Sequence, residues 1–435
     1  MIKLLEGMRV VELASFMMGP IAGRILGEWG ADVVKVEPAI KITMNPSEGD
    51  GDRMRGTGMS RGIVNGDPCC FEFVNGNKKS VCLDTFTPAG KQAMVDLCLS
   101  ADVVISHLRP KDAKKLGIDY KTLSAKNPGI ICASTSGYGT KGPDGSRPGF
   151  DAVAFTARSG MINGLSPSGE PYIPFFGMGD VTSGTYLALA ILAAYVNKLR
   201  TGKGENVTTS LYGSAIWTAG LPVMTSQYGD PYPTPRMAVF PTNKPFKCAD
   251  GKWLYVMANV WESAIADLCK VMDMPADAKT RWPHYFQAAA SKVEITEILD
   301  REFAKHDRDY WVEVLSTKTT IPFDVVADFK DVQADPQAWE AGYLTKNVVD
   351  GYEVGIPTAP GQFDNAGAPE LYMSYPGQNT VEELKKIGYS DEKIESMLKK
   401  GIVTQFDAAT YEYDRFNIMK EGTTYNKVMG GKGMM

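Results

Sequence analysis

The sequence predicts an α/β protein with a doubly wound, Rossmann-like large domain and a smaller α+β domain. Short apolar runs alternate with helical patterns as far as residue 210, which is typical of parallel strands joined by helices. The composition changes near residue 225, where proline and tyrosine become frequent, and a Pro/Gly-rich stretch covers residues 356–369. A chain of 435 residues is also longer than one simple domain.

The first strand–helix–strand unit lies at the N-terminus. Met8–Leu13 (MRVVEL) has the pattern of a buried strand, and Asp32–Val36 (DVVKV) has that of the next one. Between them Ile21–Trp29 has a helical pattern. Pro20 suits the first helical position, and Gly30 suits the end of the helix.

The pattern then repeats, which predicts parallel pairing through right-handed crossovers. Further strands are expected at Ser80–Leu83, Val103–Ile105, Ile130–Ser134 and Asn206–Ser210. Helices are expected at Pro88–Leu99, at Lys111–Lys126 in two pieces, and at Asp180–Arg200. Thr182 or Ser183 is expected to cap the last of these helices, and the glycines within residues 201–204 are expected to end it.

The domain boundaries follow from these changes of pattern. We expect the large domain to begin with residues 1–224, a small α+β domain at 225–335, a return segment at 336–406 that completes the large domain, and a polar tail at 407–435. The small domain opens with a hairpin pattern, KCADGKWLYV, which helices follow. A charged helix pair is expected at residues 380–400, with a break at residues 388–390.

The composition argues against several classes of protein. The formal charge is −5, from 46 basic and 51 acidic residues, so the basic surplus of a nucleic-acid-binding protein is absent. The seven cysteines are odd in number and include no C-x-x-C, which favours reduced thiols in a cytoplasmic protein. The N-terminus lacks the layout of a signal peptide, and the apolar stretch Leu187–Val196 is about half as long as a membrane span, so we expect no membrane segment.

The loop after the first strand resembles a dinucleotide site only in its position. It reads SFMMGPIAG instead of G-x-G-x-x-G, and Pro20 lacks a backbone donor. Glu37 ends the second strand, where a ribose-binding acid would lie. Without the glycines a pyrophosphate cannot approach the helix N-terminus. We therefore expect a doubly wound fold that holds neither NAD nor FAD.

One acidic residue stands out as a candidate for chemistry. The chain has only three histidines, and none lies in a metal-binding pattern: His107, His284 and His306. No G-x-S-x-G pattern occurs either. Asp180 follows Gly177-Met-Gly179 and lies at the start of a long helix, where a negative charge is stabilised. The residues alone leave two interpretations open for Asp180, a carboxylate nucleophile or a helix cap.

Polar clusters follow three of the expected strands. They lie at residues 75–79 (NGNKK), 107–111 (HLRPK) and 136–143 (SGYGTKGP). In an open α/β sheet, the loops at the carboxyl ends of the strands line the ligand crevice. The lysine and arginine content of these loops suits a phosphorylated ligand.

Several segments occur in a specific order along the chain: GMRVVELASFMMGP, GADVVKVEP, NGNKKSVCLD, NPGIICASTSGYGTKGP, RPGFD, GMGDVTSG, LRTGKGENVTTSL and GQNTVEELKKIGYSDEKIESML. Together, from about residue 4 to residue 403, they resemble the class III CoA-transferase family, the formyl-CoA and carnitine CoA-transferase group. Within that family the chain is most similar to the branch that acts on 2-hydroxyacyl and enoyl-CoA partners. This branch includes the phenyllactate and 2-hydroxyisocaproate CoA-transferases of amino-acid-fermenting anaerobes.

The resemblance implies a function and an assembly. Asp180, the acid in GMGDVTSG, would be the covalent nucleophile, with an acyl-CoA and a free carboxylic acid as substrates. Coenzyme A would be a substrate, with no further cofactor and no metal. The family forms interlocked homodimers, and no nucleic-acid or membrane partner is expected. The residues expected to bind substrate or coenzyme A are Ser15, Met17, Met18, Lys78, His107, Lys115, Tyr138 and Gly179.

The chain also departs from the family pattern. Met17 replaces a glutamine of some relatives, so Met17 and Met18 favour an apolar pocket for a bulky acid over one for formate or oxalate. Pro38 replaces an arginine of the family, so the adenine end of coenzyme A must be held differently.

Two alternative functions remain open. One is an acyl-CoA racemase of the same fold, although Phe150 occupies the position of its histidine base. The other is a subunit that only binds coenzyme A.

Overall fold

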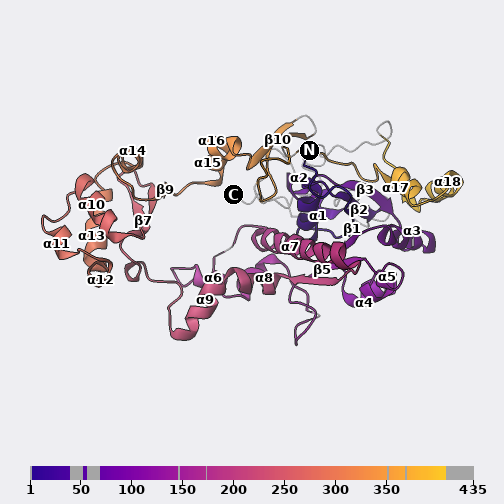
Figure 1. The fold of residues 1–435 in the computed structure, drawn as a ribbon, viewed down its shortest axis with the longest axis horizontal. Coiled ribbons are helices and arrows are strands. Elements are labelled where there is room, and N and C mark those ends of the chain that lie inside the picture. Colours follow the sequence, from indigo (N-terminus) through magenta and orange to yellow (C-terminus); the bar gives the residue numbers. More distant parts are fainter. Residues whose placement is uncertain are drawn as a thin grey trace, which may run out of the picture. The chain divides into compact units, whose positions relative to one another are not determined.

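The computed structural model describes residues 2–39, 52–55, 69–145, 147–172, 174–349, 352–367 and 370–407 (Figure 1). The chain divides into two compact units. Unit 1 consists of Met1–Met161, Ile173–Gly220 and Gln337–Met435, and unit 2 of Ile162–Tyr172 and Leu221–Pro336. The expected polar tail lies, apart from residue 407, outside the described residues.

The centre of unit 1 is a seven-stranded sheet with the strand order β12-β3-β2-β1-β4-β5-β6. Its strands are β1 (Arg9–Leu13), β2 (Asp32–Pro38), β3 (Lys79–Leu83), β4 (Val103–Ser106), β5 (Ile131–Ser136), β6 (Asn206–Ser210) and β12 (Val403–Thr404). All neighbours are parallel except the edge strand β12, which runs antiparallel to β3. This order places the topological switch point between β1 and β4. The prediction of a doubly wound α/β sheet is confirmed.

The helices of unit 1 include those that the sequence pattern predicts, with shifted ends, and three that it did not predict, at residues 69–75, 151–157 and 211–218. They are α1 (Met18–Glu28), α2 (Cys69–Asn75), α3 (Pro88–Leu99), α4 (Pro110–Leu116), α5 (Tyr120–Ser124), the π-helix η3 (Asp151–Ala157), α7 (Met178–Thr201), α8 (Leu211–Thr218), α17 (Thr380–Lys386) and α18 (Asp391–Lys399). Helix α6 (Met161–Gly164) and helix α16 (Pro336–Glu340) lie at the boundaries between the units, and β10 (Leu344–Val349) pairs with β11 (Tyr352–Pro357). The break in the charged helix pair is confirmed between α17 and α18.

The predicted cap of the long helix α7 is wrong. The helix begins at Met178, because Gly177 turns the chain into it with a left-handed backbone (φ 86°). Thr182 therefore lies inside the helix, where its hydroxyl donates to the Met178 carbonyl oxygen, and Ser183 is buried. Helix α1 likewise begins before its predicted start, so Pro20 occupies the third helical position and not the first. The C-terminal end of α7 is as predicted, with Gly202 left-handed at φ 71°.

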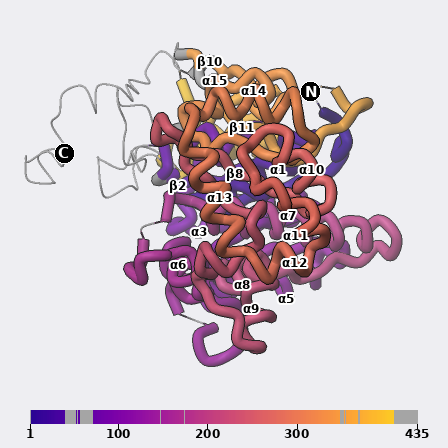
Figure 2. Tube along the Cα trace, turned by 90° about the vertical axis from the view of Figure 1, so that its left-hand side faces the viewer, coloured from indigo at the N-terminus to yellow at the C-terminus, as the bar shows by residue number. Residues whose placement is uncertain are grey.

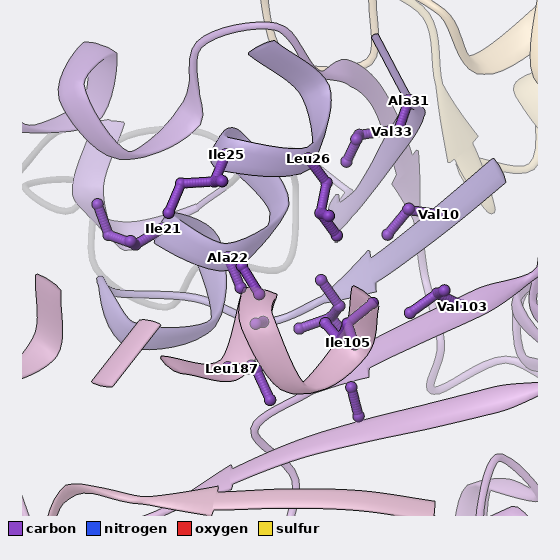
Figure 3. Close-up of a cluster of buried hydrophobic side chains, with 14 of the residues drawn as sticks. Val10, Ile21, Ala22, Ile25, Leu26, Ala31, Val33, Val103, Ile105 and Leu187 are labelled. Carbon is purple, nitrogen blue, oxygen red and sulfur yellow. The ribbon is translucent and has the colours of Figure 1, made fainter. Parts of the chain in front are cut away.

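The sheet is covered by helices on both faces. Val10 and Val103 point to the face covered by α1 and α7, where they pack with Ile21, Ile25 and Leu187 (Figure 3).

The neighbouring residues Val11 and Val104 point to the opposite face of the sheet, because successive residues of a strand alternate between the two faces. That second face is covered by α3, α17 and α18, through side chains such as Leu97, Leu384 and Met397.

Helix α7 meets the length and hydropathy criterion for a membrane span. Its buried side chains, among them Leu187 and Ile191, pack against α1 and the sheet. Core helices of soluble proteins satisfy the same criterion. This is the position of a core helix in an α/β fold. The packing of α7 on α1 and the sheet also holds its N-terminus in place.

Unit 2 has its own hydrophobic core. The predicted hairpin is confirmed as β7 (Asn243–Lys247) and β8 (Trp253–Met257), and β9 (Phe323–Val325) pairs with β8. The helices are α9 (Gly220–Thr225), α10 (Trp261–Val271), α11 (Ala278–Arg281), α12 (Tyr285–Ala290), α13 (Lys292–Phe303), α14 (Arg308–Lys318) and α15 (Phe329–Ala334). Figure 2 shows α10, α13 and α14 gathered around β8. Trp261, Trp282 and Trp311 are among the largest side chains of this core.

A network of buried charges joins strands β1 and β2 to residues 52–55. The Lys35 ammonium on β2 lies 2.9 Å from the Glu12 carboxylate on β1 and 2.8 Å from that of Asp52. The Glu37 carboxylate forms two 2.7 Å hydrogen bonds with the Arg55 guanidinium. Glu37 is therefore occupied inside the protein and does not present its carboxylate to a ribose. A buried charge is tolerated only while its partners remain in place.

The network predicts a large stability loss when one cation is removed. Lys35→Met leaves Glu12 and Asp52 buried with reduced compensation, which should lower the free energy of unfolding by about 3–5 kcal/mol. Urea denaturation at pH 7 measures this change. Lys3→Ala, which removes the exposed ion pair with Glu6, is the control and should change stability by less than about 0.5 kcal/mol. Equal stabilities of the two variants would contradict this view of the network.

Candidate active site

The loops at the switch point are joined by a hydrogen bond. The Ser15 N–H, in the loop after β1, donates to Nδ1 of His107, in the loop after β4, over 3.2 Å. Because Nδ1 accepts, the neutral imidazole carries its proton on Nε2. The Lys35 ammonium on β2 donates to the Ala14 carbonyl oxygen over 2.7 Å, and this bond also holds the loop after β1 in place. The structure thus brings the predicted residues Ser15 and His107 together at the place where this fold binds ligands.

The start of helix α7 lies against the loop after β1. The Met17 sulfur would be 3.2 Å from a Cβ atom at Gly177, and the Met17 methyl group 2.7 Å from it. The fit at Gly179 is tighter, because a Cβ atom there would lie 2.3 Å from both Oδ1 of Asp151 and Cγ of Phe155. Two glycines therefore allow the first turn of α7 to lie against Met17, Asp151 and Phe155.

Asp151 is a residue of the candidate site that the sequence analysis did not assign to it. Its side chain is 7% exposed, and its Oδ1 accepts a 2.8 Å hydrogen bond from the Gly179 N–H. Burial raises the pKa of Asp151, while backbone hydrogen bonds from Gly179 and Gly177 oppose the rise. The available signal is the acid that directly follows Pro-Gly-Phe in RPGFD, a segment that the sequence analysis used for the family resemblance and for the racemase alternative.

Asp180 projects from the first turn of α7 and is partly exposed. Among the residues that the structure describes, none donates a hydrogen bond to its carboxyl group. Burial raises the pKa of Asp180 to about 7, and the negative charge of Asp151 adds to the rise. These effects oppose the stabilisation that a helix N-terminus gives to an anion. A carboxylate with few partners and a raised pKa is more nucleophilic than one held in an ion pair.

A cluster of apolar and aromatic side chains packs against the first turn of α7, which carries Asp180. Met18 and Tyr138 are buried in one cluster with Phe155, the side chain that touches Gly179. Tyr138 also lies under two guanidinium groups, at 5.2 Å from that of Arg147 and 5.7 Å from that of Arg158. The structure therefore brings Met17, Met18, Tyr138 and Gly179 into the surroundings of Asp180. The two arginines were not predicted, because cation–π pairs leave no sequence pattern.

Two predicted binding residues lie elsewhere. The Lys78 side chain is 2% exposed, and its ammonium lies within 3.0 Å of Glu12, Asn75 and the carbonyl oxygens of Pro20 and Val74. In this arrangement Lys78 joins β1, α1 and α2 and is not available to a ligand. Lys115 is exposed at the last turn of α4, in the helix layer opposite to α7.

The fold and this carboxyl define an α/β enzyme with a candidate carboxylate nucleophile. The nucleophile lies near the carboxyl ends of the parallel strands, beside the loop that follows β1 at the switch point. The sequence profile of CoA-transferase family III matches residues 5–378, and the chain belongs to that family. It is a class III CoA-transferase.

Similarity to individual proteins supports the family assignment. The chain is 34% identical over 406 residues to (R)-2-hydroxy-4-methylpentanoate CoA-transferase of Clostridioides difficile, covering 92% of this chain and 99% of that one. It is 31% identical over 411 residues to cinnamoyl-CoA:phenyllactate CoA-transferase of Clostridium sporogenes, covering 91% of this chain and 96% of that one. A crystal structure of Rv3272 from Mycobacterium tuberculosis matches with a TM-score of 0.73 and 27% identity, covering 87% and 98% of the two chains.

The close fit at Gly179 predicts a specific sensitivity. Gly179→Ala would place a methyl group against Asp151 and Phe155, and such overpacking costs about 1–3 kcal/mol of unfolding free energy. Urea denaturation measures the loss. Gly220→Ala is the control, because nothing lies within 4 Å of its Cβ position and its stability should change by less than about 1 kcal/mol. A Gly179→Ala variant as stable as the wild type would contradict this packing.

The proximity of the two carboxyl groups predicts a pH dependence. The nucleophilic form of Asp180 is the ionised one, so kcat/KM for CoA transfer should rise with pH through about 7. Asp151→Asn keeps an oxygen for the Gly179 N–H but removes a negative charge, which lowers the pKa of Asp180 and moves the rise to lower pH. The pH–rate profiles of wild type and Asp151→Asn measure this shift. Asp391→Asn, an exposed acid on α18, is the control, and an unshifted Asp151→Asn profile would contradict the coupling.

Proposed function

We propose that this enzyme transfers coenzyme A from an acyl-CoA to a free carboxylic acid through covalent intermediates on Asp180. One observation carries the proposal: the Asp180 carboxyl is partly exposed, without a hydrogen-bond donor among the described residues, at a helix start that lies against the loop after β1. Ligands of doubly wound folds bind beside that loop. This position supports Asp180 as the group that attacks the bound thioester.

The chemistry proceeds by exchange at carbonyl carbons. An Asp180 oxygen attacks the donor thioester, the C–S bond breaks, and a mixed anhydride and the CoA thiolate form. The thiolate then attacks the aspartyl carbonyl carbon, which releases the donor acid and leaves an aspartyl-CoA thioester. The acceptor carboxylate attacks this thioester to give a second anhydride, and the thiolate takes the acceptor acyl group. Every bond broken is replaced by a similar one, so the exchange needs neither ATP nor a metal.

The raised pKa of Asp180 fits both roles of the side chain. The ionised form attacks the thioester, and the pKa of about 7 leaves a substantial ionised fraction near neutral pH. The same partly desolvated carboxyl must also become neutral when it is acylated. Burial and the Asp151 charge destabilise the anion, and acylation removes that unfavourable charge.

The substrates we propose are 2-hydroxy, enoyl, branched or aromatic acids. Two relatives act, by name, on 2-hydroxy-4-methylpentanoate and on cinnamoyl-CoA with phenyllactate. Met17 packs beside the start of α7 and is only 4% exposed, so its thioether forms part of the apolar packing behind the site and supplies no hydrogen-bond donor there. This environment favours a bulky apolar acyl group over formate or oxalate.

We also propose the assembly and setting that the family resemblance implies. The protein would be an interlocked homodimer in the cytoplasm, with coenzyme A as a substrate and no other cofactor. The racemase alternative requires a proton-transferring group at position 150. Phe150 occupies that position, and it cannot move a proton.

Replacement of the nucleophile tests the proposal. Asp180→Asn should lower the rate of CoA transfer by on the order of 10⁴-fold or more, since an amide cannot form the anhydride. Wild-type enzyme incubated with acyl-CoA and hydroxylamine should carry a hydroxamate on Asp180, seen by peptide mass spectrometry. Asp391→Asn should react and transfer like the wild type. Transfer by Asp180→Asn at the native rate would exclude the mechanism.

A further inference from the structure

Two phenylalanines form an aromatic pair beside the start of α7. Phe16 lies in the loop after β1, and Phe150 directly precedes η3. Their ring centroids are 6.2 Å apart at an interplanar angle of 78°, which is an edge-to-face contact. Phe150 is 67% exposed, so a large part of this aromatic pair is open to a ligand.

The backbone ties the aromatic pair to the candidate nucleophile from two sides. Met17 follows Phe16, and its sulfur and methyl group meet Gly177. Asp151 follows Phe150, and its carboxylate accepts the N–H of Gly179. Both neighbours of the pair therefore contact the short segment that carries Asp180, which places the pair beside the helix start from which Asp180 projects.

The backbone of Phe16 is strained. Its φ of 65° lies in the left-handed region, which is an outlier for a bulky residue. The other non-glycine residue with a positive φ in the described part of the chain is Asn77, a residue type that tolerates this conformation. The bonds from Ser15 to His107 and from Lys35 to the Ala14 carbonyl hold the loop in place. Strain of this kind persists where surrounding structure enforces it, commonly at ligand sites.

We propose that Phe16 and Phe150 form the acyl-binding surface of the enzyme and select acyl groups that carry a phenyl ring. The inference rests on the proposed CoA transfer and specifies its substrate class. A phenyl ring gains edge or stacking contacts on Phe150 that a short unbranched alkyl chain, such as that of a butyryl group, does not. Phe16 and Phe150 are specificity-determining residues, and they take no part in bond making.

Isotope exchange between an acyl-CoA and its own labelled free acid tests this inference. The two probes are 3-phenylpropionyl-CoA with labelled 3-phenylpropionate, and butyryl-CoA with labelled butyrate. Phe150→Ala should lower kcat/KM for the phenyl substrate by on the order of 10-fold and change that for butyryl-CoA by less than about 2-fold. Phe16→Gly should do the same, and glycine accepts the left-handed backbone without strain, so folding is preserved.

The control is Phe86→Ala, which removes another strongly exposed phenylalanine, in the turn after β3. It should leave both exchange rates unchanged. An equal loss with both probes, no loss with either, or a wild type that exchanges only butyrate would overturn the aromatic acyl site while leaving CoA transfer intact. A wild type that exchanges neither acid would overturn this inference, and hydroxylamine trapping on Asp180 would show separately whether the proposed CoA transfer stands.

Discussion

The first turn of helix α7 is the constraint on which the candidate site depends. Gly177 supplies the left-handed backbone that starts the helix, and Gly179 leaves room for a carboxylate and an aromatic ring where a side chain would clash. These two positions allow α7 to lie against the loop after β1. Because one side of α7 packs on α1 and the sheet, the position of Asp180 is set by the core and not by a mobile loop.

The electrostatics of this turn combine opposing effects. A helix N-terminus favours an anion, and Asp151 uses that preference by accepting the Gly179 N–H. The Asp151 carboxyl then raises the pKa of the neighbouring Asp180, together with burial. Asp151 thus holds the helix start in place and also makes Asp180 a less stable anion, which would favour the proposed conversion of Asp180 to a neutral acyl derivative. The buried network around Lys35 supports the opposite side of the site, because it holds the Ala14 carbonyl.

Local patterns were enough to predict the sheet and the candidate nucleophile. The valine runs of β1, β2 and β4 are buried on both faces of the sheet. Such continuous apolar runs can be recognised as strands from the sequence alone, before the neighbouring strands are known. Asp180 was found from its flanking glycines and from the family resemblance. The role of Asp151 depends on a partner 28 residues away, and that of Lys78 on a pocket formed by β1, α1 and α2. Such contacts appear only when the chain is folded, which is why Asp151 was missed and Lys78 was assigned to the ligand.

Oxygen transfer to Asp180 tests the central claim most directly. The enzyme would turn over an acyl-CoA with an acceptor acid labelled with ¹⁸O in both carboxylate oxygens, and the peptide that contains Asp180 would be analysed by mass spectrometry. The covalent mechanism predicts that one labelled oxygen of the acceptor remains on the Asp180 carboxyl when the thiolate takes the acyl group. Formation of the new acyl-CoA with no label on Asp180 would show that the acceptor never reacted with this side chain, and would contradict the account.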